Sequence, residues 1–307
     1  MNTNSAFDQG PLGVAASPEP KSTRPMVSPA GDCHFGVEVT GVDLHDLTTD
    51  DLSWVRQVWS DNPLLLIRRQ LLTEDNLMDF SRFFGDLEVV VRKDIHSRHN
   101  PEIALVSNLY LEDGSNIGGL GPYELRWHSD QSYRTRPATG AVFYALEIPP
   151  EGGNTRWIDM VQAWATLDAE IQRVLDGRMG QFAYQMYNTD ITDEPGAKDI
   201  RARTPDAEHP LVLTHPKNGQ RSLYFDPSQT YAIAGLPHDE SDELVRHLSE
   251  HVVDPRFIQE HQWHIGDVML WDNSRLLHSR CAFDPLHPRL AKRTTVFLEP
   301  DWFPVPA

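Results

Sequence analysis

The run "AVFYALEI", residues 141–148, is a short stretch of β-favouring side chains bounded by glycine and proline. Runs of this kind, separated by Gly, Pro and Asn turns, predict strands. Between residues 103 and 299 only two helical patterns, at 159–177 and 239–252, interrupt them. Many short strands with few inserted helices predict an all-β core folded as a double-sheet jelly roll, or double-stranded β-helix. The other runs are "IALVSNL", "TRWIDM", "PLVLTH", "RSLYF", "DVMLWD" and "RTTVFLE".

The part of the chain before residue 103 mixes helical and strand patterns. Residues 1–29 are rich in Ser, Pro, Gly, Ala and Asn, so we expect a disordered arm there. Residues 30–307 contain no internal repeat, and we expect a single domain. The early elements expected within it are strands at 34–44 and 63–69, a helix within 48–62, and a helix that begins after Thr73 and ends at Gly85.

Composition limits the classes of partner. The chain has 307 residues and a formal net charge of −18. Phosphate backbones and anionic membrane surfaces repel such a chain, so nucleic acid and membrane partners are not expected. No run is apolar enough for a membrane span, no signal peptide is evident, and two cysteines, Cys33 and Cys281, are too few for a disulfide framework. We expect a cytoplasmic protein, and a homo-oligomer stays open.

The segment "RWHSDQSY", residues 126–133, holds a histidine and an aspartate two positions apart. Residues two apart in a strand point to one face, where His128 and Asp130 would form a small chelate. His278, in "LLHSR", is a distal third candidate, and two histidines with one carboxylate are the ligand set of non-haem iron(II). A lone HxD pair also arises by chance, so this set alone does not decide the metal.

Four other histidines could compete for the role of third ligand. His209 and His215 lie on either side of a predicted strand, and we interpret both as structural hydrogen-bonding residues near turns. The other two are His264 and His287.

Residues 34–299 resemble the TauD/TfdA family of iron(II)- and 2-oxoglutarate-dependent dioxygenases. The resemblance implies a jelly-roll core in which His128, Asp130 and His278 bind Fe(II), with O2 as oxidant and 2-oxoglutarate as co-substrate. Because Asp130 is present, it also implies hydroxylation rather than halide transfer. The matching blocks, in family order, are "FGVEVTGVDL", "LLLIRRQLLTEDNLMDFSRFFGDLE", "WHSDQSY", "GGNTRW", "HPLVLTHPKNGQRSLYF", "GDVMLWDN", "LLHSR" and "RLAKRTTV".

A 2-oxoglutarate enzyme needs a cation for the carboxylate that lies far from the metal. A planar guanidinium suits this carboxylate, and Arg280, Arg289 and Arg293 all follow His278. Arg289 lies eleven residues past His278, which is the family spacing for this arginine. Thr155 similarly matches the family threonine that contacts the same carboxylate.

The expected substrate class rests on one residue that matches the family pattern and on three that depart from it. Arg293 matches the arginine that binds the acid group of the substrate in taurine- and aryloxyalkanoate-type members. Val90, Lys93 and Glu124 stand where taurine-type members carry polar pocket residues. We therefore expect a small organic anion, a carboxylate or a sulfonate or sulfate ester, that is less polar than taurine. Val90 would line its pocket, and Glu124 or Lys93 would contact a second polar group.

Other readings stay open. The same chemistry could act on a larger natural-product or amino-acid-derived intermediate, by hydroxylation, desaturation or cyclisation. A non-catalytic metal- or ligand-binding jelly roll and a zinc hydrolase on a cupin-like fold are further alternatives, but neither needs Thr155 and Arg289. The Gly-rich segment 110–126 is either a lid over the substrate or a plain connection.

Overall fold

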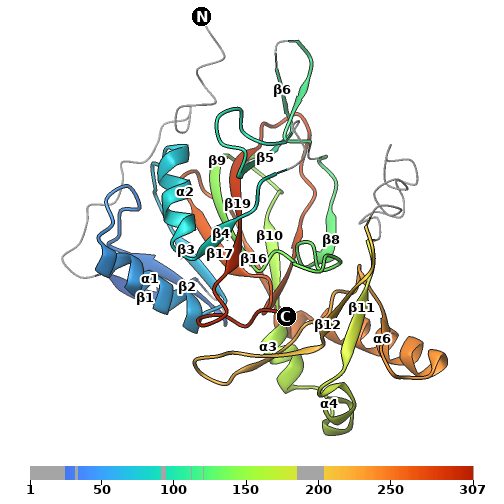
Figure 1. Ribbon diagram of the computed structural model, residues 1–307. Helices are drawn as coiled ribbons and strands as arrows, with labels where there is room; N and C mark the ends of the chain where they lie inside the picture. Colours follow the sequence, from blue (N-terminus) through green and yellow to red (C-terminus); the bar gives the residue numbers. More distant parts are fainter. Residues whose placement is uncertain are drawn as a thin grey trace, which may run out of the picture.

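The computed structural model describes residues 25–31, 34–90, 95–111, 113–119, 121–184 and 204–306. Its centre is a pair of β-sheets (Figure 1). The larger sheet has the order β1-β2-β3-β17-β9-β19-β4, with β5 also paired to β19, and the smaller has the order β16-β10-β18-β8. The larger sheet comprises β1 (Met26–Pro29), β2 (Gly36–Thr40), β3 (Leu64–Ile67), β4 (Gly85–Leu87), β5 (Ile103–Ser107), β9 (Gly140–Glu147), β17 (Val268–Asp272) and β19 (Leu290–Leu298). The smaller comprises β8 (Leu125–His128), β10 (Thr155–Asp159), β16 (Ile258–His261) and β18 (Leu276–Arg280).

A layer of aromatic side chains joins the two sheets. Phe143 and Trp271 come from the larger sheet, Trp157 comes from the smaller, and Trp263 lies in the link between β16 and β17. The ring centroids of Phe143 and Trp263 are 4.7 Å apart, and those of Trp157 and Trp271 are 6.0 Å apart. Burial of large rings between stacked sheets supplies most of the apolar area that holds a sandwich together. The predicted jelly-roll core is therefore confirmed.

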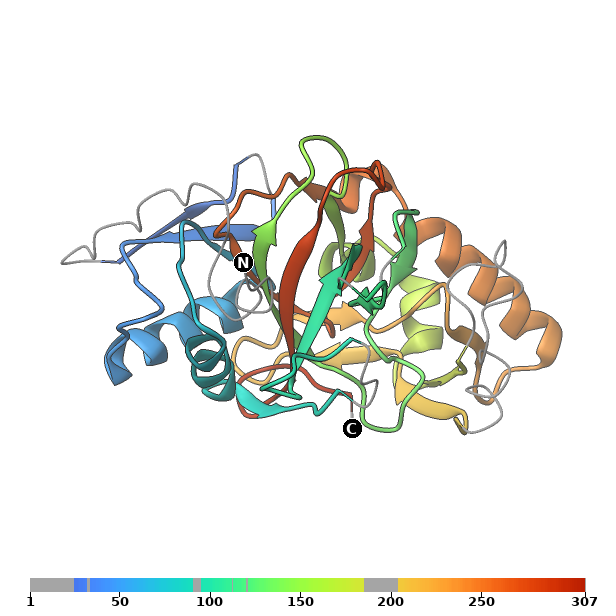
Figure 2. The same cartoon turned by 90° about the horizontal axis from the view of Figure 1, so that it is seen from above.

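Helices cover the outer faces of this sandwich. Helices α1 (Thr49–Asp61) and α2 (Glu74–Arg82) lie on one side, and α6 (His238–Val252) lies on the other (Figure 2). Thr48 and Thr73 each form a capping box, so both early helices begin where the sequence predicts. Within the described residues, no helix is both long and apolar enough to cross a membrane.

The prediction of a disordered arm over residues 1–29 is wrong for the last four of these residues. Met26–Pro29 form strand β1, which pairs antiparallel with β2, although all four residues are exposed. Main-chain hydrogen bonds make this strand without apolar burial, so the side chains carry no signal for it. The rest of the predicted arm, residues 1–24, lies outside the described residues.

The helix expected over 159–177 is two helices, α3 (Met160–Ala165) and α4 (Ala169–Leu175). Asp159 is the N-cap of α3, since its carboxylate accepts from the backbone of the first turn. Leu167 is buried in the break, which turns the chain. The remaining elements are β6 (Leu109–Tyr110), β7 (Asn116–Ile117), β11 (Met179–Phe182), β12 (Ala207–Pro210), β13 (Val212–Thr214), β14 (Arg221–Leu223), β15 (Thr230–Ile233) and the short 3-10 helix Pro255–Phe257.

The two histidines interpreted as structural are indeed hydrogen-bonded in the fold. The Nε2 atom of His209 lies 2.9 Å from the carbonyl of Arg134. His215 is buried, its Nε2 atom lies 2.8 Å from the carbonyl of Ser60, and its Nδ1 accepts from the backbone of Lys217. Burial, reinforced by the positive charge of Arg275, lowers the pKa of His215 to about 4.

This pKa predicts an acid-labile contribution to stability. Below about pH 6.5 the unfolded chain binds a proton at His215 that the folded chain does not bind until about pH 4, so stability falls across that window. At pH 5 the loss from this group is about 2 kcal/mol. We expect the unfolding free energy of His215→Gln to fall less between pH 7.5 and pH 5 than that of the wild type. Urea denaturation at the two pH values measures it. Equal losses in the two proteins would contradict the assignment.

Candidate active site

His128, Asp130 and His278 meet between the sheets. The last residue of β8, His128, lies opposite His278 in the antiparallel pairing with β18, and the ring centroids are 4.2 Å apart. The Nε2 atoms of His128 and His278 lie 3.9 and 3.8 Å from the Asp130 carboxylate. All three residues are buried, and one ligand atom from each lies within 4.8 Å of the others. The structure thus brings together the three predicted ligands.

The route by which Asp130 reaches the histidines differs from the expectation. The two residues were expected on one strand face, but β8 ends at His128 and Asp130 lies in the following turn. Gln131, next in the chain, has a φ of 56°, in the left-handed region. The turn, and not strand alternation, therefore brings the carboxylate to the histidines.

A buried aspartate that the sequence analysis did not select holds this turn. One carboxylate oxygen of Asp226 accepts from the backbone N–H of Ser129 at 3.0 Å and from the hydroxyl of Ser132 at 2.7 Å. The Ser129 hydroxyl donates to the carbonyl of Asn273. The only signal in the sequence is an acid directly after the β-run "RSLYF", which is too common to identify a partner in advance.

Hydrogen bonds and packing also set the orientation of the ligand side chains. The Nδ1 atom of His128 lies 2.7 Å from the carbonyl of Arg126, so Nδ1 carries the proton and Nε2 keeps its lone pair toward Asp130. The ring of His278 packs 5.1 Å from that of Trp271, whose indole N–H donates to Asn273. The Asn273 amide in turn reaches an Asp130 oxygen at 3.5 Å. Outer contacts of this kind orient metal ligands.

The charge states of Asp130 and His278 suit a metal ion. Burial alone would raise the pKa of Asp130, but Arg293, followed by the two histidines, holds it well below its usual range. Burial, together with the nearby positive groups, lowers the pKa of His278 to about 3. A carboxylate and an uncharged imidazole are the forms that coordinate metals, so the donor set fits Fe(II).

Arg289 is a buried guanidinium that lacks a partner for two of its nitrogens. It is 1% exposed, and within the described chain the N–H groups of Nε and Nη1 donate no hydrogen bond. Burial, followed by repulsion from Arg280, lowers its pKa to about 9. The guanidinium lies 5.7 Å from the ring of Phe143, in the same aromatic layer that supports His278. Such a group is costly unless an anion joins it, so Arg289 fits a carboxylate of a bound molecule.

The backbone two residues before Thr155 lies close to this arginine. A Cβ atom on Gly153, two residues earlier, would stand 3.4 Å from Nε of Arg289. Gly153 has a φ of +67°, so a side chain is disfavoured there and the guanidinium can approach the backbone. The Thr155 hydroxyl accepts from the indole N–H of Trp263 at 3.0 Å, and its own proton can be donated.

The expected substrate residues are only partly brought to the site. The guanidinium of Arg293 bonds both Asp130 oxygens at 3.1 Å. Glu124 instead pairs with Arg156, which also bonds Ser279, a neighbour of His278 on the opposite face of β18. Val90 is half-buried and donates its N–H to Pro101, and Lys93 lies outside the described residues.

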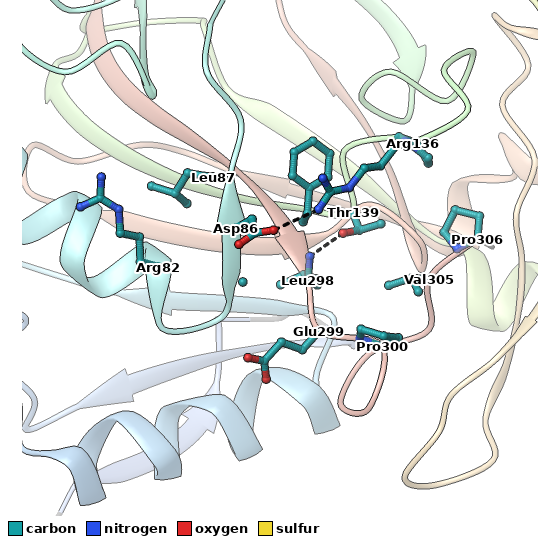
Figure 3. A pocket seen from close by; sticks show the side chains of 13 residues that line it. Arg82, Asp86, Leu87, Arg136, Thr139, Leu298, Glu299, Pro300, Val305 and Pro306 are labelled. Atoms are coloured by element: carbon teal, nitrogen blue, oxygen red, sulfur yellow. Dashed lines mark hydrogen bonds and ion pairs between the residues drawn. The ribbon is translucent and has the colours of Figure 1, made fainter.

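A separate hollow of about 600 Å³ lies away from the triad, between β4, the end of β19 and the C-terminal segment (Figure 3). Arg136 pairs with Asp86 at its rim, and both side chains are largely exposed. It shares no residue with the triad or with Arg289.

Comparison with known proteins agrees with this geometry. The family model for the taurine catabolism dioxygenase TauD, TfdA family, matches residues 22–295. The chain belongs to this family. A pentalenolactone F synthase from Streptomyces arenae is 31% identical over 290 residues, covering 89% of this chain and 94% of that protein. An (S)-phenoxypropionate/alpha-ketoglutarate-dioxygenase from Sphingobium herbicidovorans is 30% identical over 277 residues, covering 88% and 94%.

Solved structures of family members are similar. A taurine dioxygenase from Burkholderia xenovorans has a TM-score of 0.72 and 28% identity, covering 92% of this chain and 94% of that one. AAD-2 in complex with Mn(II) and N-oxalylglycine has a TM-score of 0.72 and 27% identity, covering 89% and 97%. The protein is therefore a 2-oxoglutarate-dependent dioxygenase that uses Fe(II), 2-oxoglutarate and O2. The non-catalytic and zinc hydrolase alternatives are not favoured.

The contacts of Asp226 predict its effect on metal binding. Asp226→Ala should free the turn that carries Asp130 and weaken Fe(II) affinity about tenfold or more, the range found for residues that orient metal ligands. Anaerobic calorimetric titration measures this affinity. Asp176→Ala, which removes a carboxylate from an exposed ion pair, is the control. Unchanged affinity in Asp226→Ala would contradict the role.

Proposed function

We propose that this dioxygenase oxidises a small organic acid whose acid group pairs with Arg293. In this proposal His128, Asp130 and His278 hold Fe(II), and Arg289 with Thr155 binds the distal carboxylate of 2-oxoglutarate. The observation that carries the substrate class is the position of Arg293, a cation in direct contact with the carboxylate of the metal-binding triad.

The contacts of Arg293 leave one edge of its guanidinium for a ligand. Nη1 is engaged with Asp130, whereas Nε is buried and, within the described residues, has no hydrogen-bond partner. A carboxylate or sulfonate suits that edge, because adjacent N–H groups of a guanidinium can donate to two oxygens of one anion. An acid held there would have its nearest C–H bonds beside the metal. We therefore propose oxidation on the carbon next to the acid group, or one bond further.

Bound iron and 2-oxoglutarate supply the oxidising chemistry: the co-substrate is converted to succinate and CO2, and one oxygen atom from O2 enters a C–H bond of the substrate. The protein supplies binding and orientation. Asp130 and the two histidines hold the metal, and the buried rings of Trp271 and Phe143 pack beside His278 and the guanidinium of Arg289.

Aryloxyalkanoates are the substrate class that we favour. Relatives that match this chain include (S)-phenoxypropionate and 2,4-dichlorophenoxyacetate dioxygenases. Val90 remains proposed as an apolar contact for the body of such a substrate, and Lys93 as a polar one. The ion pair with Arg156 makes Glu124 a less suitable contact than the sequence indicated.

A substrate panel tests this proposal. We expect succinate formation to be faster with 2-phenoxypropanoate and phenoxyacetate than with taurine or an alkyl sulfate. Oxidation of the carbon that bears the ether oxygen yields a hemiacetal, which releases phenol, so phenol should appear in step with succinate. A terpenoid lactone acid belongs in the panel, because its preferential turnover would favour the larger natural-product alternative instead.

A separate experiment on the Arg293→Ala variant tests whether Arg293 binds the acid group of the substrate. Arg293→Ala should lose at least about a hundredfold in kcat/KM for the acid substrate, as expected when a buried charged pair is removed. The 2-oxoglutarate requirement should change little, and Fe(II) affinity is measured separately, because Arg293 contacts Asp130. Turnover of the methyl ester as fast as that of the acid in the wild type would refute the anion-binding role.

A further inference from the structure

A second buried arginine lies beside the proposed co-substrate site. Arg280, two residues past His278 at the end of β18, is 4% exposed. Its Nη2 donates to the carbonyl of Gly121 at 2.8 Å and to that of Tyr123. Its Nε and Nη1 are buried and, in the described part of the chain, have no hydrogen-bond partner. Half of this guanidinium is thus used by the backbone, and the other half is available.

Arg280 and Arg289 both lie near the ring of Phe283. Arg280 lies opposite Thr155 in the pairing of β18 with β10. The guanidinium carbon of Arg280 is 5.1 Å from the ring centroid of Phe283, and that of Arg289 is 6.0 Å from the same centroid. The two are close enough for repulsion between them to lower the pKa of Arg289.

Two buried cations this close require an anion. Within the described residues neither guanidinium forms an ion pair with a carboxylate, and each keeps two buried nitrogens without a partner. An unpaired buried charge is strongly unfavourable, and a second one of the same sign adds to the cost. A purely structural Arg280 would need only Nη2 for the two carbonyls. Its remaining two nitrogens therefore indicate a ligand.

We propose that Arg280 is a second arginine for the distal carboxylate of 2-oxoglutarate, which would lie between Arg280, Arg289 and the hydroxyl of Thr155. The inference rests on the proposed co-substrate site and extends it. A carboxylate has two oxygens with about four acceptor positions, enough for both guanidinium groups and the hydroxyl. Through Nη2, the same arginine also contacts the backbone of Gly121 and Tyr123, which lie within segment 110–126, the segment expected to be a lid or a plain connection.

The test compares 2-oxoglutarate with 2-oxobutanoate, which differ only in the distal carboxylate. 2-Oxobutanoate keeps the 2-oxo acid end that meets the metal but lacks the distal carboxylate of 2-oxoglutarate. Dissociation constants for both are measured by calorimetry on the Fe(II)-loaded protein under argon, so that no turnover occurs. The variants are Arg280→Gln, Arg280→Lys and Arg289→Gln. Arg156→Gln is the control, because it removes a charge from the neighbouring strand on the opposite sheet face.

We expect Arg280→Gln to weaken 2-oxoglutarate binding about ten- to hundredfold, the range for one lost charged hydrogen bond, and to leave 2-oxobutanoate binding unchanged. Arg280→Lys should recover part of the loss. The Arg280→Gln/Arg289→Gln double variant should lose less than the product of the single losses, because both residues act on one carboxylate.

Two results would overturn the inference. If Arg280→Gln weakens both ligands equally, the residue only supports the fold. If it weakens neither, its free nitrogens do not reach the carboxylate. If the co-substrate assignment itself is wrong, the Arg289→Gln variant binds 2-oxoglutarate as tightly as the wild type does. This result distinguishes that failure from a failure of the Arg280 inference.

Discussion

Strand β8 pairs with β18 so that His128 faces His278, and the geometry of the metal site follows from this register. A slip by one residue would turn either imidazole to the outer face of the sheet, because strand side chains alternate. The aromatic layer of Phe143, Trp157 and Trp271 buries the inner face and makes such a slip costly. The turn after β8 then needs only to direct Asp130 back to the pair, and Asp226 fixes that turn.

The distribution of charge explains how an acidic protein can bind an organic acid. The chain carries a net charge of −18, yet Arg280 and Arg289 are buried, and Arg293, whose side chain is 24% exposed, contacts the carboxylate of Asp130. Surface charge acts through water and salt and is screened, whereas buried guanidinium groups act at short range in a medium of low polarity.

Sequence reasoning found what depends on local pattern or on spacing along the chain. The strands formed by apolar runs, the capped helices after Thr48 and Thr73, and the triad belong to this group. It missed features that depend on residues distant in sequence. The contact between Ser129 and Asp226 spans 97 residues and leaves no periodic signal. The pairing of Glu124 with Arg156, 32 residues away, is likewise a contact that the local sequence does not indicate.

The order of strands in the sheets has a consequence for how the chain reaches its folded state. The last strands in sequence, β17, β18 and β19, occupy interior positions: β17 lies between β3 and β9, β18 between β10 and β8, and β19 between β9 and β4. During synthesis from the N-terminus, neither sheet can close until these strands have emerged. Such long-range pairing slows folding and leaves strand edges exposed meanwhile. A chain that stops before residue 268 lacks the middle of both sheets as well as His278, so no shorter N-terminal fragment forms a self-contained sandwich.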